Sequence, residues 1–181
     1  MIALKYFKQS DYAQLIQWID SPEFLLQWGG PGFNFPLDEQ QLDTYVSNAN
    51  HHNAETLIYK VVEKELGNVI GHISLGKIDR KNMNARIGKV LVGNADARGK
   101  GIGQQMIKAT LKIAFDELYL HRVSLGVFDF NSSAIACYEK VGFQREGILR
   151  DYRKIGNKYW NLIEMSMLEH EWRVIQKTKT I

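Results

Sequence analysis

The chain has 181 residues, of which 45% are hydrophobic and one is a cysteine, and its formal net charge is +3. This length supports one well-formed core, so a single domain over residues 1–181 is expected. One cysteine excludes an intramolecular disulfide framework and a multi-cysteine zinc site. The scattered Lys and Arg residues and the small net charge predict no nucleic-acid partner. Without a signal-like apolar segment or a run of roughly 18 apolar residues, we expect a cytoplasmic protein with no membrane partner.

The N-terminal part of the chain, about residues 10–49, predicts helices. Apolar spacing indicates a helix over 10–28 that breaks at Ser21-Pro22 and continues as a short second helix. Asp38 is a suitable first residue for another helix over 37–49. The glycines of 29–32 indicate a loop between them.

From residue 56 onward the hydrophobic pattern alternates, which is typical of strands. We predict strands over 56–62, 69–75, 85–92, 121–128, 143–155 and 159–168, and helices over 104–118 and 131–140. A strand, a helix and a strand in succession predict parallel neighbours with a right-handed crossover. The fold class is therefore α/β (α+β), with a mixed, mostly antiparallel sheet, one central parallel strand pair and flanking helices.

A glycine-rich loop, Arg98-Gly99-Lys100-Gly101-Ile102-Gly103, separates the strand at 85–92 from the next helix. Glycines allow backbone N–H groups to point inward, and the helix start adds unsatisfied donors and a positive dipole end. Such a loop can bind phosphate. It is not a Walker loop, because Gly101 follows Lys100, and it is not a dinucleotide fingerprint, because Gln104 replaces the third glycine. A tight strand-to-helix turn without a ligand is the alternative.

A second motif, NSSAIACYEKVGF at residues 131–143, follows the other strand of the parallel pair. It contains an Asn cap, a one-sided apolar helix and a glycine stop at Gly142. Both motifs begin at the carboxyl ends of neighbouring parallel strands, which is where ligands bind in open sheets.

Together Arg98-x-x-Gly101-x-Gly103, NSSAIACYEKVGF and EGILRDY resemble the GCN5-related N-acetyltransferases (GNAT), specifically the RimJ/RimL-like branch. The resemblance extends from ALKYFKQSDYAQLIQWI to MSMLEHEW. It implies the GNAT fold, with acceptor-side helices at about 10–49, a cofactor-binding core at about 56–143 and a hairpin at 143–168. It also implies acetyl-CoA as cofactor and a primary amine as acceptor, either a protein N-terminal α-amine or a small-molecule amine. The protein would be a monomer or a homodimer.

Site residues follow from the same resemblance. The backbone of the loop would hold the coenzyme A pyrophosphate, the strand end would pair with the pantetheine arm, and the second motif would contact the cofactor near its sulfur. These residues are Arg98, Gly99, Lys100, Gly101, Ile102 and Gly103; Val90, Leu91 and Val92; and Asn131 and Tyr138. Tyr138 can donate a proton to the departing thiolate, or it can simply pack on the apolar helix face.

Acceptor recognition is expected from aromatic residues of the glycine-containing loop and the last hairpin. Trp28, Phe33 and Trp160 are the candidates, although they could instead cover the sheet edge. Related enzymes frequently carry an acidic residue where Arg86 stands. Arg86 makes a strongly cationic acceptor such as a polyamine less expected, unless neighbouring carboxylates compensate its charge. The general base stays unassigned.

Other reactive side chains indicate no further site. The pair His51-His52 lacks carboxylate partners, so we predict an exposed loop and no metal. Cys137 is expected to be a small buried thiol rather than a nucleophile, and His72 is expected to point into the sheet, with the acceptor cleft as the alternative. A catalytically silent acyl-CoA sensor of the same fold is the alternative function, and the presence of Tyr138 favours the enzyme.

Overall fold

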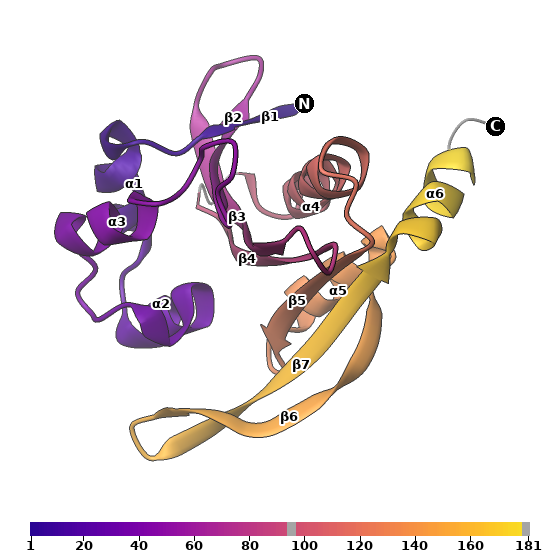
Figure 1. Cartoon of the computed structure of the whole chain (residues 1–181). Helices are drawn as coiled ribbons and strands as arrows, with labels where there is room; N and C mark the ends of the chain where they lie inside the picture. Colours follow the sequence, from indigo (N-terminus) through magenta and orange to yellow (C-terminus); the bar gives the residue numbers. More distant parts are fainter. Residues whose placement is uncertain (94–96, 179–181) are drawn as a thin grey trace.

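The computed structural model describes residues 1–93 and 97–178, so 94–96 and 179–181 of the predicted domain lie outside this description. Within the described residues the strands form a seven-stranded sheet in the order β1-β2-β3-β4-β5-β7-β6 (Figure 1). The strands are β1 Ile2–Tyr6, β2 Leu57–Glu63, β3 Val69–Asp79, β4 Asn84–Val92, β5 Arg122–Phe128, β6 Gln144–Ile155 and β7 Lys158–Leu168. Only β4 and β5 are parallel among these pairs. The predicted mixed sheet with one central parallel pair is confirmed.

Helices flank this sheet, and all but the C-terminal one were predicted from the sequence. They are α1 Tyr12–Trp18, α2 Pro22–Gly29, α3 Glu39–Val46, α4 Ile102–Lys112 with a π-helical extension Ile113–Glu117, α5 Ser132–Val141 and α6 Glu169–Thr178. The Ser21 hydroxyl accepts a hydrogen bond from the amide of Phe24 (3.2 Å) at the start of α2. Asp38 accepts one from the amide of Gln41 (2.8 Å) at the start of α3. These caps explain why the chain restarts a helix at each position.

Two elements were not predicted from the sequence. The edge strand β1 pairs antiparallel with β2, from Ile2 opposite Glu63 to Tyr6 opposite Tyr59. Helix α6 is highly charged, and it docks through Trp172, which is buried and donates a hydrogen bond to Asp116 (3.1 Å). Both elements depend on partners that lie far away in the sequence.

Two apolar clusters lie on opposite faces of the sheet. The larger one joins α4 and α5 to the strands, and the smaller one joins α1, α2 and α3 to β2 and β4. Strand β2 supplies both, since Tyr59 belongs to the first cluster and its neighbour Ile58 to the second. Helices α1 to α3 therefore cover only the β1–β4 half of their face, as Figure 1 shows.

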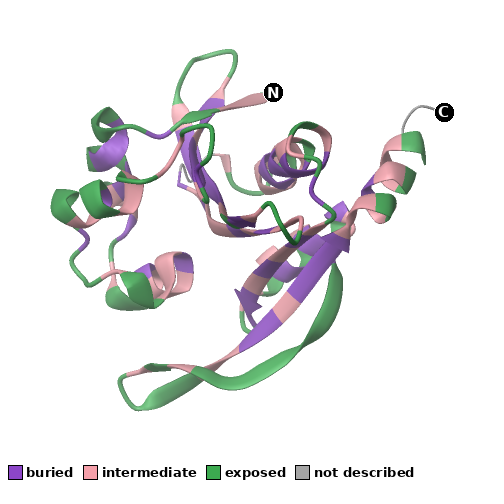
Figure 2. Cartoon of the chain, viewed as in Figure 1, coloured by how far each residue is buried: buried purple, intermediate pink, exposed green. Residues whose placement is uncertain are grey.

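Strands β6 and β7 form a long hairpin that extends from the rest of the molecule (Figure 1). The turn is at Gly156-Asn157, as predicted. Strand β6 is exposed along nearly its whole length (Figure 2). Its later part nevertheless lies next to the site described below, since Tyr152 and Arg153 line the cavity there.

We expect Gly142→Ala to lower the free energy of unfolding by about 2–4 kcal/mol, as measured by urea titration. Gly142 has φ of 116°, and an added Cβ would lie 2.5 Å from Cδ1 of Ile175. The matched control is Gly156→Ala, which has φ of 54° and open space around the new Cβ. It should cost only about 1 kcal/mol, the backbone strain alone. Equal losses in the two variants would contradict the packing role of Gly142.

Candidate functional site

The parallel strands β4 and β5 separate soon after they begin. Their pairing covers only Asn84 with Arg122, Ala85 with Val123 and Arg86 with Ser124. Strand β4 then stays paired with β3 while its other edge has no strand partner among the described residues. A gap therefore opens in the middle of the sheet.

A β-bulge in β4 accompanies this separation. Opposite β3, the register passes from Ser74–Gly88 to His72–Leu91, so β4 carries one extra residue. Lys89 lies in the bulge with φ of 51°. A bulge bends a strand and increases its twist, which turns β4 away from β5.

A cavity of about 500 Å³ occupies the gap. Its wall comes from 87–90 of β4, 125–128 of β5, 27–31 around the end of α2, and from Tyr138 of α5. The wall thus includes residues from the α2 side and from the α5 side of the sheet, and its volume suits a small-molecule ligand.

The glycine-rich loop begins at the end of β4. Gly99 and Gly101 have φ of 74° and 75° with open space around them, so glycine is needed for the backbone conformation. Gly101 is the N-cap of α4 and provides no side-chain cap, whereas the N-cap of α5, Asn131, accepts a hydrogen bond from the amide of Ala134 (3.2 Å). The first amides of α4 therefore remain available for an anion.

Arg98 and Gly103 have structural roles in addition. The Arg98 guanidinium donates to the Val92 carbonyl (3.1 Å) and so folds the loop back onto the end of β4. A Cβ at Gly103 would lie 3.3 Å from Sγ of Cys137, so this glycine lets α4 approach α5 closely. Lys100 is exposed and Ile102 is half-buried.

Tyr138 lies on the cavity wall, with 7% of its surface exposed. Its ring also packs against Phe143, with centroids 6.3 Å apart. The hydroxyl makes no hydrogen bond to any other described residue. Burial raises the pKa of this phenol well above its ordinary value, so the group keeps its proton.

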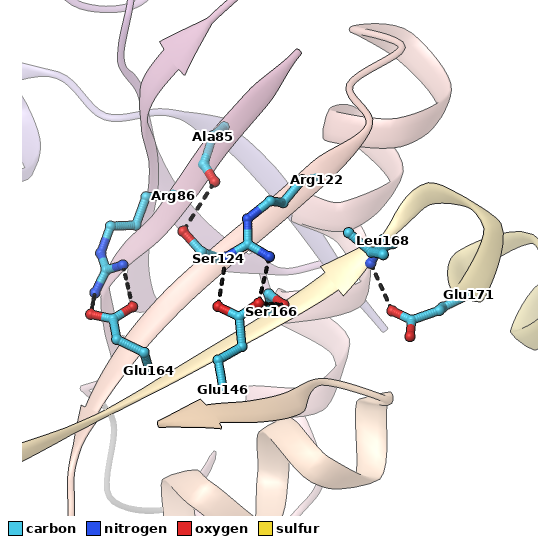
Figure 3. Close-up of polar contacts among 9 residues, drawn as sticks. All are labelled: Ala85, Arg86, Arg122, Ser124, Glu146, Glu164, Ser166, Leu168 and Glu171. Carbon is cyan, nitrogen blue, oxygen red and sulfur yellow. Dashed lines mark hydrogen bonds and ion pairs between the residues drawn. The ribbon is translucent and has the colours of Figure 1, made fainter. Parts of the chain in front are cut away.

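Arg86 is paired with a carboxylate, as Figure 3 shows. Its two terminal nitrogens each donate to one oxygen of Glu164 on β7, both at 2.7 Å. The guanidinium crosses β5 at Gly126, where an added Cβ would lie 2.4 Å from Nη2. Glu164 thus provides the compensation that the sequence left open. The sequence gives one indication of this role, because Glu164 is an isolated acidic residue in the apolar stretch WNLIEMSML.

A second ion pair lies on the same sheet face (Figure 3). Arg122 contacts both carboxylate oxygens of Glu146 at 2.6 Å, and the Ser166 hydroxyl donates to Glu146 at 2.8 Å. Hydrogen bonding to Arg122 lowers the pKa of Glu146 to about 2.

The carbonyl of Lys89, freed by the bulge, accepts two hydrogen bonds. The Trp28 indole donates at 2.9 Å and Nδ1 of His72 lies 3.0 Å away, which places the proton of this imidazole on Nδ1. Burial lowers the pKa of His72 to about 4, so the ring is neutral. His72 is buried among the rings of Phe7, Trp28 and Tyr45 and is not part of the cavity wall.

Of the four residues predicted to bind the acceptor, two line the cavity and two do not. Trp28 and Arg86 lie on the cavity wall. Phe33 lies behind the wall, stacked on Trp28 at 5.6 Å between centroids. Trp160 packs edge-on against Phe128 and Phe130, with centroids 5.0 and 4.9 Å away.

Of the predicted cofactor-side residues, Val90 and Asn131 line the cavity, while Leu91 is buried in the smaller apolar cluster. Wall residues that sequence reasoning missed include Tyr45, Lys77, Lys89 and Arg153. Only Lys89 left a signal, because it interrupts the apolar end of the strand sequence ARIGKVLV.

His51 and His52 are exposed, as expected. Across residues 1–93 and 97–178, no group of His, Cys, Asp and Glu side chains could hold a metal ion. No helix in the same ranges is both long and apolar enough to cross a membrane.

Comparison with known proteins decides the family. The profile of the Acetyltransferase (GNAT) domain matches residues 2–144. The chain belongs to the GNAT acetyltransferase family. The same GNAT fold is found in a crystal structure of spermidine N-acetyltransferase from Vibrio cholerae in complex with CoA and spermine. It superimposes with a TM-score of 0.81, 22% identity, and coverage of 95% of this chain and 98% of that chain.

Curated GNAT relatives are distant. An uncharacterized N-acetyltransferase p20 from Bacillus licheniformis is 31% identical over 114 residues, which is 63% of each chain. The chain thus spans less than two thirds of the length of that relative. An aminoglycoside N(6')-acetyltransferase type 1 from Klebsiella pneumoniae is 24% identical over 151 residues, covering 81% of this chain and 75% of the relative.

The Arg122–Glu146 pair should make stability depend on pH. Because the folded pKa of Glu146 is depressed to about 2, its contribution is present above about pH 4.5 and is lost as the pH falls toward 2. Urea unfolding of Glu146→Gln should show a smaller loss over this window than the native chain, by at most about 1 kcal/mol because the pair is partly exposed. Glu65→Gln, in an exposed turn, is the control. Parallel pH profiles for Glu146→Gln and the native chain would contradict the assignment.

Proposed function

We propose that this GNAT protein is an acetyl-CoA-dependent N-acetyltransferase of the RimJ/RimL-like branch that acetylates a primary amine. The observation that carries the proposal is the cavity that passes through the sheet where β4 and β5 separate. The glycine-rich loop follows the end of β4, and the Tyr138 phenol lies on the cavity wall. Relatives named for spermidine and aminoglycoside acetylation support an amine as acceptor.

The residues present fit coenzyme A. The uncapped start of α4 supplies amides from Gly101 to Gly103 for phosphate oxygens, assisted by the positive end of the helix. The edge of β4 that faces away from β3 leaves backbone groups at Val90 for a polar, extended ligand chain, whereas the Val92 carbonyl already accepts a hydrogen bond from Arg98. Asn131 lines the same cavity. Acetyl-CoA, when bound, supplies a thioester carbonyl that is reactive toward amines.

The chemistry then requires a C–N bond to form and the C–S bond to break, while the nitrogen loses a proton to water and the sulfur gains one. Tyr138 holds such a proton, since burial keeps its pKa high and no described residue occupies its hydroxyl. The amine must reach the gap uncharged. An α-amine, with a pKa of about 7.7–8.0, meets this condition more readily than a lysine-type amine with a pKa of about 10.4.

Gly101→Asp should abolish acetyl-CoA binding measured by calorimetry, because its carboxylate would face the phosphates at the start of α4. The space around Gly101 is open, so the fold should persist. Gly101→Asn is the matched control, since Asn has the same shape without the charge and tolerates a positive φ. Unchanged binding by Gly101→Asp would refute the loop assignment, and equal loss in both variants would indicate a backbone effect.

Tyr138→Phe should preserve acetyl-CoA binding and lower the rate of thiol release by about 10²-fold. The assay monitors free thiol with acetyl-CoA and a panel of amino-acid, peptide, polyamine and aminoglycoside acceptors. Full activity in Tyr138→Phe would show that Tyr138 does not donate the proton and that its ring only packs against its neighbours. Tight acetyl-CoA binding by the native chain with no acceptor-dependent release would favour a silent acyl-CoA sensor.

A further inference from the structure

We propose that the acceptor is an amine that also carries an anionic group, a carboxylate or a phosphate, and that Lys77 and Lys89 bind this group. The inference rests on the proposed function, because it identifies the chemical class of the amine. It differs from what the names of the spermidine and aminoglycoside relatives suggest, since those acceptors are polycations.

The charges on the cavity wall are of one sign. The charged wall residues are Lys77, Arg86, Lys89 and Arg153, and no Asp or Glu is among the described residues of the wall. Glu164 neutralises Arg86 through its two hydrogen bonds. Within the described part of the chain, the other three cations form no ion pair. The cavity therefore carries uncompensated positive charge.

Arg153 contributes less than the lysines because its guanidinium is already held. It lies 3.9 Å from the centroid of the Tyr152 ring, and it donates to the Tyr152 carbonyl at 3.0 Å. These contacts orient Arg153 along β6 at the edge of the cavity. Arg153 therefore adds to the positive electrostatic potential of the cavity, but it is not the main group that binds the anion.

Lys89 is held in place by its surroundings. Its Nζ lies 5.0 Å from the ring centroid of Tyr45 and 5.6 Å from that of Phe33. Ring faces stabilise a cation but do not neutralise it. The backbone is fixed as well, because Trp28 and His72 both bind the Lys89 carbonyl. The ammonium is thus positioned before any ligand arrives.

Both lysines occupy strained backbone positions. Lys77 has φ of 50° and Lys89 has φ of 51°, a region that costs a residue with a Cβ about 1–3 kcal/mol. Each lies at an irregularity of the sheet, where the β3–β4 register shifts between Gly76 and Asp79 and again between His72 and Ser74. Two like charges at two strained sites on one wall indicate a ligand-binding role for their side chains.

Electrostatics determines which ligand fits. Burial lowers the pKa of Lys89, and the charge of Lys77 lowers it further, so the two ammonium groups are unfavourable neighbours. A bound anion would relieve this repulsion, whereas a second ammonium on the acceptor would increase it. An amine with a nearby carboxylate or phosphate therefore complements the positive charge of the cavity wall, and a polyamine does not.

The test compares matched acceptors in the thiol-release assay. Aspartic acid α-amide is compared with asparagine amide, phosphoserine amide with serine amide, and spermidine is the polycation. We expect kcat/KM to be at least about 10-fold higher for the anionic member of a pair, and the two pairs distinguish carboxylate from phosphate. Equal or better use of spermidine or of the neutral amides would overturn the inference.

Variants connect the preference to the lysines. Lys77→Gln and Lys89→Gln should each reduce the preference about 10-fold, through a higher KM for the anionic acceptor and little change for the neutral one. Lys89→Arg should keep the preference, and Lys64→Gln, in the exposed β2–β3 turn, should not alter it. If Lys89→Gln instead lowers kcat equally for every acceptor, Lys89 does not discriminate between acceptors and the anion-binding role is wrong.

Calorimetry separates this inference from the proposed function. Phosphoserine amide and serine amide are titrated into the native chain saturated with coenzyme A, which needs no turnover. Tighter binding of the phosphorylated amide, lost in Lys89→Gln, supports the anion site even if no acceptor releases thiol and the proposed function fails. Equal binding of the two amides overturns the anion site even if neutral amines are acetylated.

Discussion

The short pairing of β4 with β5 is the constraint on which the site depends. Three residue pairs hold the two halves of the sheet together, and beyond Arg86 and Ser124 the strands diverge. The bulge at Lys89 turns β4 away, which exposes one backbone edge and opens the cavity through the sheet. A continuous parallel pair would satisfy that edge and close the gap. The unpaired backbone is therefore a requirement of the site and is compensated around it by contacts such as that of Arg98 with Val92.

Charge is arranged on the same framework. Gly126 permits Arg86 to reach Glu164 across β5, which removes one positive charge from the acceptor side. Lys77 and Lys89 receive no such carboxylate within the described chain. The GNAT fold is shared with a spermidine N-acetyltransferase, but a shared fold does not fix the acceptor, which depends on the side chains of the site.

Sequence reasoning was reliable where the signal is local. Helix caps at Ser21, Asp38 and Asn131, and the turn at Gly156-Asn157, are determined by neighbouring residues, and the elements they delimit were placed within a few positions. Strand β1 and helix α6 were missed because their stability comes from distant partners, namely β2 and Asp116. The sequence could not separate the aromatic residues that line the cavity from those that do not, for a similar reason. Nothing in the sequence indicates that Trp28 lies on the wall while Phe33 stacks behind it.

By itself, the sequence determined the central parallel pair, the glycine-rich loop that opens α4, and the helix that carries Tyr138, because spacing and glycine chemistry specify each of them locally. Only the tertiary structure decided which charges meet. Bulges shift side chains from one face of a strand to the other, and the register between strands is a long-range property. For that reason the pairing of Arg86 with Glu164, and the convergence of Lys77 and Lys89 on one cavity, emerge only when β3, β4, β5 and β7 are side by side.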